Sequence, residues 1–105
     1  DLAKQTIGQF RFDYAVIGCS ALHEAGEILD FDFQEVGVSK EIISRSEHVF
    51  LVADASKFER KAPARIASLS SVDVFFTDHP PPSGTQSMCQ AANTRIVVAP
   101  QSITP

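Results

Sequence analysis

The sequence lacks the features that several classes of protein require. It contains no tryptophan and only two cysteines among 105 residues. Its apolar runs are only a few residues long, whereas a membrane-spanning helix needs about 20. The first residues combine no basic stretch with an apolar stretch, so they predict no signal peptide. The chain therefore predicts neither a membrane-spanning protein nor a secreted one.

Cysteine and histidine are too few and too scattered to predict a metal site. Cys19 and Cys89 stand far apart, in no spacing typical of metal ligands. We interpret them as reduced thiols of a cytosolic protein. His23, His48 and His79 form neither an H-x-x-x-H nor an H-x-x-H pattern. We therefore expect no metal and no cofactor.

Basic charge and known catalytic motifs are also missing. Nine basic residues against thirteen acidic ones give a net charge of −4. Proteins that bind duplex DNA favour a basic face, because binding releases counterions from the phosphates. The sequence has no Gly-x-Ser-x-Gly elbow, P-loop or Gly-x-Gly-x-x-Gly motif. This segment is therefore not expected to read DNA, although a segment outside it could.

The remaining composition is that of one globular domain. Apolar residues make up 44% and charged residues 21%, which excludes most disordered compositions. The length is sufficient for one domain. The chain begins with Asp1 and not with methionine. We interpret residues 1–105 as part of a longer protein.

Apolar runs alternate with amphipathic stretches along the chain. Uninterrupted apolar runs are typical of strands buried on both faces of a parallel sheet, and alternation with helices implies βαβ units. We predict an α/β fold, with a mostly parallel sheet and helices on both faces. Four strands are fewer than the usual 5–6, so an edge is expected to need a partner. The predicted strands are 14–17, 48–53, 72–77 and 95–99. The predicted helices are 2–12 (capped by Asp1), 35–46 and 84–92. Segment 19–26 is predicted to be a loop, and segment 28–33 a short strand or an extended connection.

Polar side chains follow three of these strands. Ligands in open α/β sheets bind beyond the carboxyl ends of the strands, so we expect these groups to converge. The side chain of Lys57 could bind a phosphate or a carboxylate. Each group could instead serve only to cap a turn. The groups are Gly18-Cys19-Ser20, Asp54-Ala-Ser56-Lys57 and Thr77-Asp78.

The same residues resemble a known family. The runs FDYAVIGCS (12–20), LVADASKF (51–58) and VDVFFTD (72–78) are similar in order and spacing to the C-terminal effector-sensing domain of DeoR-family bacterial transcriptional repressors. The run LDFDFQEV (29–36) resembles the branch that controls glycerol-3-phosphate genes. The similarity covers about two thirds of the chain, from about residue 10 to 78.

The resemblance implies a ribose-5-phosphate-isomerase-like domain that binds a phosphorylated sugar or polyol, with glycerol 3-phosphate as a candidate, and thereby relieves repression. It also implies a homo-oligomer. A helix-turn-helix and a Gly-Thr-Thr type phosphate loop should precede this segment, so DNA would be contacted only through a part outside residues 1–105. The effector-binding residues that it implies are Gly18, Cys19, Ser20, Lys40, Asp54, Ser56 and Lys57.

Two alternatives remain open at this point. The related isomerases carry an Asp-Gly-Ala-Asp motif, and the matching Ile17-Gly-Cys-Ser20 has lost both aspartates. A sugar isomerase needs a positioned general base, so the resemblance favours a sensor over an enzyme. The other alternative is an oligomerisation module with a vestigial pocket.

Overall fold

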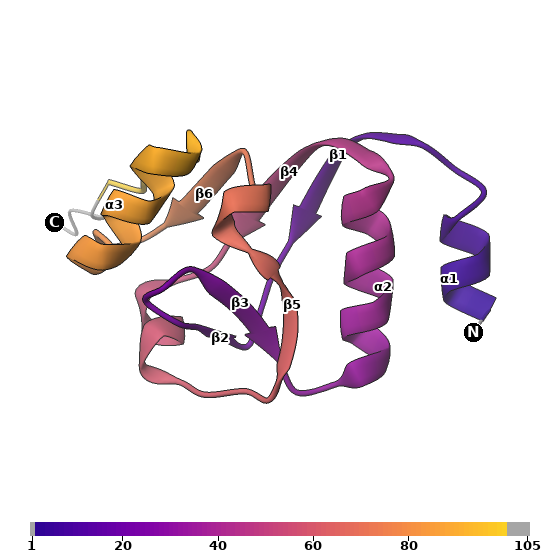
Figure 1. Cartoon of the computed structure of the whole chain (residues 1–105), viewed down its shortest axis with the longest axis horizontal. Coiled ribbons are helices and arrows are strands. Elements are labelled where there is room, and N and C mark those ends of the chain that lie inside the picture. Colours follow the sequence, from indigo (N-terminus) through magenta and orange to yellow (C-terminus); the bar gives the residue numbers. More distant parts are fainter. Residues whose placement is uncertain (1, 101–105) are drawn as a thin grey trace, which may run out of the picture.

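The computed structural model describes residues 2–100, and within them strands and helices alternate as expected (Figure 1). Four strands form an entirely parallel sheet in the order β1-β4-β6-β7. The predicted capping role of Asp1 lies outside the described residues. The strands of this sheet are β1 (Phe12–Ile17), β4 (Ser46–Val52), β6 (Val74–Thr77) and β7 (Arg95–Val98), and the helices are α1 (Leu2–Ile7), α2 (Phe33–Ser44) and α3 (Ser83–Ala92).

Local signals in the sequence set the helix ends. Helix α2 begins where the carboxylate of Asp32 accepts the backbone N–H of Gln34 at 2.8 Å and that of Glu35 at 3.4 Å. These bonds satisfy donors that the first helical turn leaves unpaired. Helix α3 ends at Asn93, which adopts the left-handed conformation with φ of 62°. None of the helices within residues 2–100 combines the length and the apolar character needed to cross a membrane.

A second, antiparallel sheet was not predicted. It pairs β2 (Ala21–Leu22), β3 (Glu27–Asp30) and β5 (Ala64–Ser68) in the order β2-β3-β5. The loop predicted at 19–26 therefore contains a strand. A two-residue strand is too short to show a period, so its pairing depends on the neighbouring strand and not on its own pattern. Two short 3-10 turns, η1 (Ala55–Glu59) and η2 (Leu69–Ser71), complete the fold.

The hydrophobic core lies on one face of the parallel sheet. Ile17, Leu51 and Phe75 stand side by side in register on that face and are at most 7% exposed. They pack in one cluster with residues of α2, α3 and the small sheet. Figure 1 shows α1 beside α2 at one end of the molecule and α3 at the other. Helices and small sheet together cover this face.

The opposite face of the parallel sheet differs from the prediction. Tyr14, Val16 and Val52 are 62%, 68% and 53% exposed. Each new strand is added on the same side of its predecessor, from β1 to β7. Because crossovers between parallel strands are right-handed, successive steps in one direction place every connection on the same face. Within residues 2–100, helices therefore cover one face and not both.

Candidate functional site

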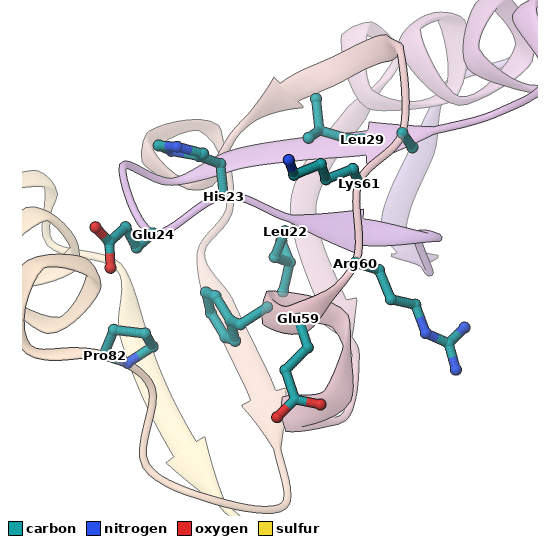
Figure 2. Close-up of a pocket in the computed structure, with 10 residues that line it drawn as sticks. Leu22, His23, Glu24, Leu29, Glu59, Arg60, Lys61 and Pro82 are labelled. Atoms are coloured by element: carbon teal, nitrogen blue, oxygen red, sulfur yellow. The ribbon is translucent and has the colours of Figure 1, made fainter.

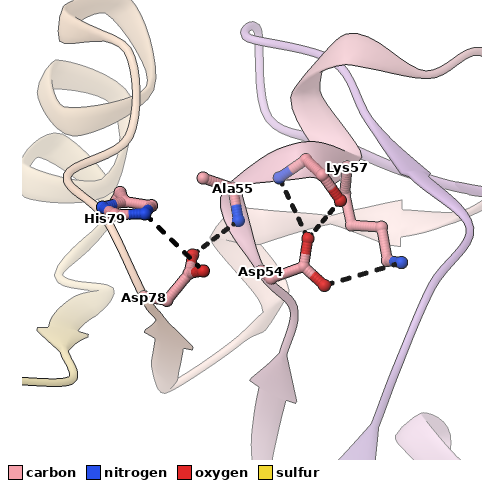
Figure 3. Close-up of polar contacts among 6 residues, drawn as sticks. Asp54, Ala55, Lys57, Asp78 and His79 are labelled. Carbon is pink, nitrogen blue, oxygen red and sulfur yellow. Dashed lines mark hydrogen bonds and ion pairs between the residues drawn. The ribbon is translucent and has the colours of Figure 1, made fainter. Parts of the chain in front are cut away.

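The three polar strand ends meet where the parallel strands have their carboxyl ends, which we call the sheet edge. Gly18 follows β1, Asp54 lies just beyond β4, and Asp78 follows β6. The backbone N–H of Ala55 donates to the Asp78 carboxylate at 2.8 Å, which joins the ends of two neighbouring strands (Figure 3). The predicted convergence is thus found among the described residues.

The turn after β4 holds a lysine beside a carboxylate. Asp54 accepts the backbone N–H of Ser56 at 3.0 Å and also accepts from the Ser56 hydroxyl. The Nζ atom of Lys57 lies 3.8 Å from Asp54 Oδ2 (Figure 3). The Ser56 hydroxyl is the main cause that lowers the pKa of Asp54, and the charges of Lys57 and Arg60 lower it further. The Asp54 carboxylate is therefore anionic at neutral pH and orients Lys57.

The segment after β1 lies close to this turn. Cys19 is half-buried, and burial raises the pKa of its thiol to about 11, although the nearby positive charge of Lys57 acts in the opposite direction. The Ser20 hydroxyl donates to Asp30 at 2.8 Å. A thiol with so high a pKa is protonated at neutral pH and is a poor nucleophile. This arrangement is suited to binding and not to attack by the cysteine.

Lys40 is not brought to this edge by any contact within residues 2–100. A hollow of about 620 Å³ lies beside Gly18, and the α2 residues that line it include Ser39 but not Lys40, which is exposed. Three acidic side chains, Asp30, Asp32 and Glu35, also line this hollow. Carboxylates accept hydrogen bonds from hydroxyl groups, so the hollow suits the polyol part of a ligand better than a phosphate. A role for Lys40 stays a prediction.

A second hollow was not predicted as a site. It measures about 460 Å³ and lies between the β2–β3 turn and the segment that follows η1 (Figure 2). Leu22, Leu29 and Phe58 give it apolar walls. Figure 2 shows Lys61 beside Leu29, with the Arg60 side chain extending outward. Its one signal in the sequence is the density of basic residues at Lys57, Arg60, Lys61 and Arg65, of which Arg60 and Lys61 line it. None of the predicted effector-binding residues lines it.

Thr77, at the end of β6, carries a buried hydroxyl for which residues 2–100 supply no hydrogen-bond partner. Replacing Thr77 by valine is expected to raise the free energy of unfolding by about 1 kcal/mol, because an unsatisfied buried hydroxyl is costly. Thr85→Val is the matched control, since the Thr85 hydroxyl donates to the Glu24 carbonyl oxygen at 2.7 Å. That variant should lose about 1 kcal/mol. Urea unfolding measures both, and an equal loss in the two variants would contradict the prediction.

No group of three or more histidine, cysteine, aspartate or glutamate side chains within residues 2–100 is arranged to hold a metal ion. The side chains that gather at the sheet edge are those of a lysine, two serines, a thiol and carboxylates. Such a set provides a cation for an anionic group and acceptors for hydroxyl groups. Its chemistry fits the recognition of a small molecule that carries both.

Comparison with known proteins places these residues in context. Residues 1–79 match the family model described as the DeoR C-terminal sensor domain. The glycerol-3-phosphate regulon repressor of Escherichia coli K12 is 46% identical over 72% of this chain. The repressor of the same name from Haemophilus influenzae is 40% identical over 88% of the chain, and the HTH-type transcriptional repressor CsqR of E. coli K12 is 30% identical over 91%.

The aligned stretches make up 30%, 36% and 37% of the length of these three relatives. The chain thus spans about a third of the length of each of these curated relatives.

Proposed function

The chain belongs to the family of DeoR C-terminal sensor domains, and from that premise we propose that it is the effector-sensing part of a transcriptional repressor. Its effector is a phosphorylated sugar or polyol, and binding relieves repression. The observation that carries the proposal is Lys57, held 3.8 Å from Asp54 beside the Gly18–Ser20 segment. The relatives named for the glycerol-3-phosphate regulon support glycerol 3-phosphate as the effector.

The charges of the site support one orientation of such a ligand. Lys57 is the cation at the sheet edge, and its side chain is 21% exposed, so it can pair with a phosphate. Asp30 and Asp32 line the hollow beside Gly18. These carboxylates would repel a phosphate but accept hydrogen bonds from hydroxyl groups. We therefore place the phosphate near Lys57 and the polyol in the acidic hollow.

Relief of repression requires that the effector distinguish two states of the repressor. A ligand that binds both states equally shifts no equilibrium, however tightly it binds. The segment after β1 and the turn after β4 belong to different strands, and the charge of Lys57 acts on Cys19 between them. A ligand held by both segments favours the state in which they are closest.

Lys57→Met in the full-length protein is expected to weaken glycerol 3-phosphate binding by about 10- to 100-fold, because a charge-assisted hydrogen bond is lost. Methionine keeps an unbranched side chain of similar shape, one atom shorter, and removes the charged amino group. Isothermal titration calorimetry measures the affinity. Lys61→Met is the matched control, since Lys61 is an exposed lysine that lines the other hollow, and it should bind as the parent does.

Two results of this experiment would contradict the proposed site. One is an unchanged affinity in Lys57→Met, and the other is an equal loss in Lys57→Met and Lys61→Met. Titration with glycerol in place of glycerol 3-phosphate isolates the polyol part. Its weaker binding should be the same in the parent and in Lys57→Met, because the phosphate is the partner of Lys57.

A further inference from the structure

The uncovered face of the parallel sheet is mainly apolar and aromatic, with Arg95 as its one basic residue among residues 2–100. We call it the bare face and define it by the residues in register across β1, β4, β6 and β7. Its aromatic rings form a row in which Tyr14 lies 5.3 Å from His48 and 5.7 Å from Phe50, and Phe50 lies 5.9 Å from Phe76, between ring centroids. The bare face consists of Phe12, Tyr14, Val16, Ser46, His48, Phe50, Val52, Val74, Phe76, Arg95 and Val97.

An apolar face of this kind needs a cover. Parallel sheets occur almost only with both faces covered, because both carry apolar side chains. Tyr14, Val16 and Val52 are each more than half exposed. Contiguous exposed apolar surface on that scale marks an interaction site. Residues 2–100 cannot supply the cover, since all their crossovers lie on the other face.

The outer edge of β1 is also without a neighbouring strand among residues 2–100, since β1 ends the strand order β1-β4-β6-β7. Residues 2–100 add strands in the direction from β1 to β7, whereas a strand added at the outer edge of β1 would extend the sheet in the reverse direction. Right-handed crossovers between strands that are added in this reverse direction lie on the bare face. One continuous segment can therefore pair with β1 and cover the bare face.

We propose that the bare face and the outer edge of β1 are covered by the part of the same polypeptide that lies on the N-terminal side of residue 1 in the full-length protein. Two observations favour this occupant over a second copy of the chain. The matched stretches are only 30–37% of the relatives' length, and the matching family model is that of a C-terminal domain. Two copies stacked on their bare faces would leave both β1 edges unpaired. The proposal does not depend on the identity of the effector.

Cysteine labelling of the full-length protein tests this proposal. Val16→Cys and Val52→Cys place a thiol on the bare face, and Ser70→Cys places one on an exposed turn away from it. A maleimide reagent is applied across a wide range of protein concentration, extending down to the monomer as judged by sedimentation. Labelled peptides are then quantified by mass spectrometry, which separates the new thiol from Cys19 and Cys89.

We expect the bare-face thiols to react at least about tenfold more slowly than the Ser70→Cys thiol, because a covered site reacts only through opening of the structure. This protection should be the same at every concentration, including that of the monomer. Labelling as fast as in Ser70→Cys would overturn the proposal. Protection that disappears in the monomer would overturn it too, and would assign the bare face to a second copy.

A measurement without substitutions guards against variants that fold poorly. Hydroxyl-radical footprinting of the unmodified full-length protein compares the oxidation of Tyr14 and Phe76 with that of Phe31, which is 62% exposed and lies outside the bare face. Each rate is normalised to that of the unfolded protein. Protection of Tyr14 and Phe76 relative to Phe31 in the monomer supports the proposal, and equal oxidation overturns it.

Discussion

Replacing Phe75 by alanine should lower the free energy of unfolding by about 3–5 kcal/mol, the usual cost of removing a fully buried phenylalanine. Phe75 is completely inaccessible to solvent and lies in register between Leu51 and Ile96. Its ring centroid is 6.3 Å from that of Phe58. These neighbours belong to the strands on either side and to the turn η1, so they cannot all move in to fill the cavity.

Urea unfolding followed by circular dichroism measures this loss. Phe31→Ala is a matched control, because Phe31 is 62% exposed and its replacement should change the stability by no more than about 0.5 kcal/mol. Equal losses in the two variants would contradict a core centred on Phe75. The effect of Phe75→Ala should be seen as a lower urea midpoint with an unchanged slope.

Gly26→Ala should be destabilising by about 2–4 kcal/mol, through two separate causes. Gly26 has φ of 97°, a conformation that side chains with a Cβ atom rarely adopt. A Cβ atom there would clash with Cε of Met88, and it would lie 3.2 Å from Sδ of Met88 and 3.7 Å from the Cβ of Leu69. Met88 can move aside in part, but the backbone strain remains.

Gly84→Ala is the same substitution at another glycine, and here it should stabilise the protein. Gly84 lies in the first turn of α3, and a Cβ atom built there meets nothing within 4 Å. Alanine is the better helix former, so this variant should gain about 0.5–1 kcal/mol. Thermal unfolding measures the midpoint temperature of both variants. A shift of the two midpoints in the same direction would disprove the argument. Combining Gly26→Ala with Met88→Ala should show favourable coupling, because the shorter side chain removes the clash.

Much of the fold could be predicted because its strands are apolar runs separated by breaks. Strand β4 and helix α3 were predicted to within two residues at each end, since a four- or five-residue apolar run and a stretch after three prolines are strong local signals. The uncovered face could not be predicted. Phe50 and Leu51 are equally apolar neighbours that point to opposite faces, so composition gives no sign that only one of them meets a helix.

The location of the candidate site could be predicted from the sequence, but the contacts within it could not. Parallel topology alone brings Gly18, Asp54 and Asp78 to one edge of the sheet. The hydrogen bond from the Ala55 N–H to Asp78 joins residues 23 positions apart, and that from Ser20 to Asp30 depends on how the small sheet packs. The choice between Ser39 and Lys40 depends on the rotation of α2, which its weak amphipathic pattern does not define.

The strand order has a consequence for how the chain is made. Synthesis proceeds from the amino end, so β1 leaves the ribosome before β4, β6 and β7, which follow in the order in which they pair. Each emerging strand therefore finds the edge of its predecessor already exposed, and no strand has to be inserted between two that are already joined. The sheet can grow during translation by simple addition at one edge.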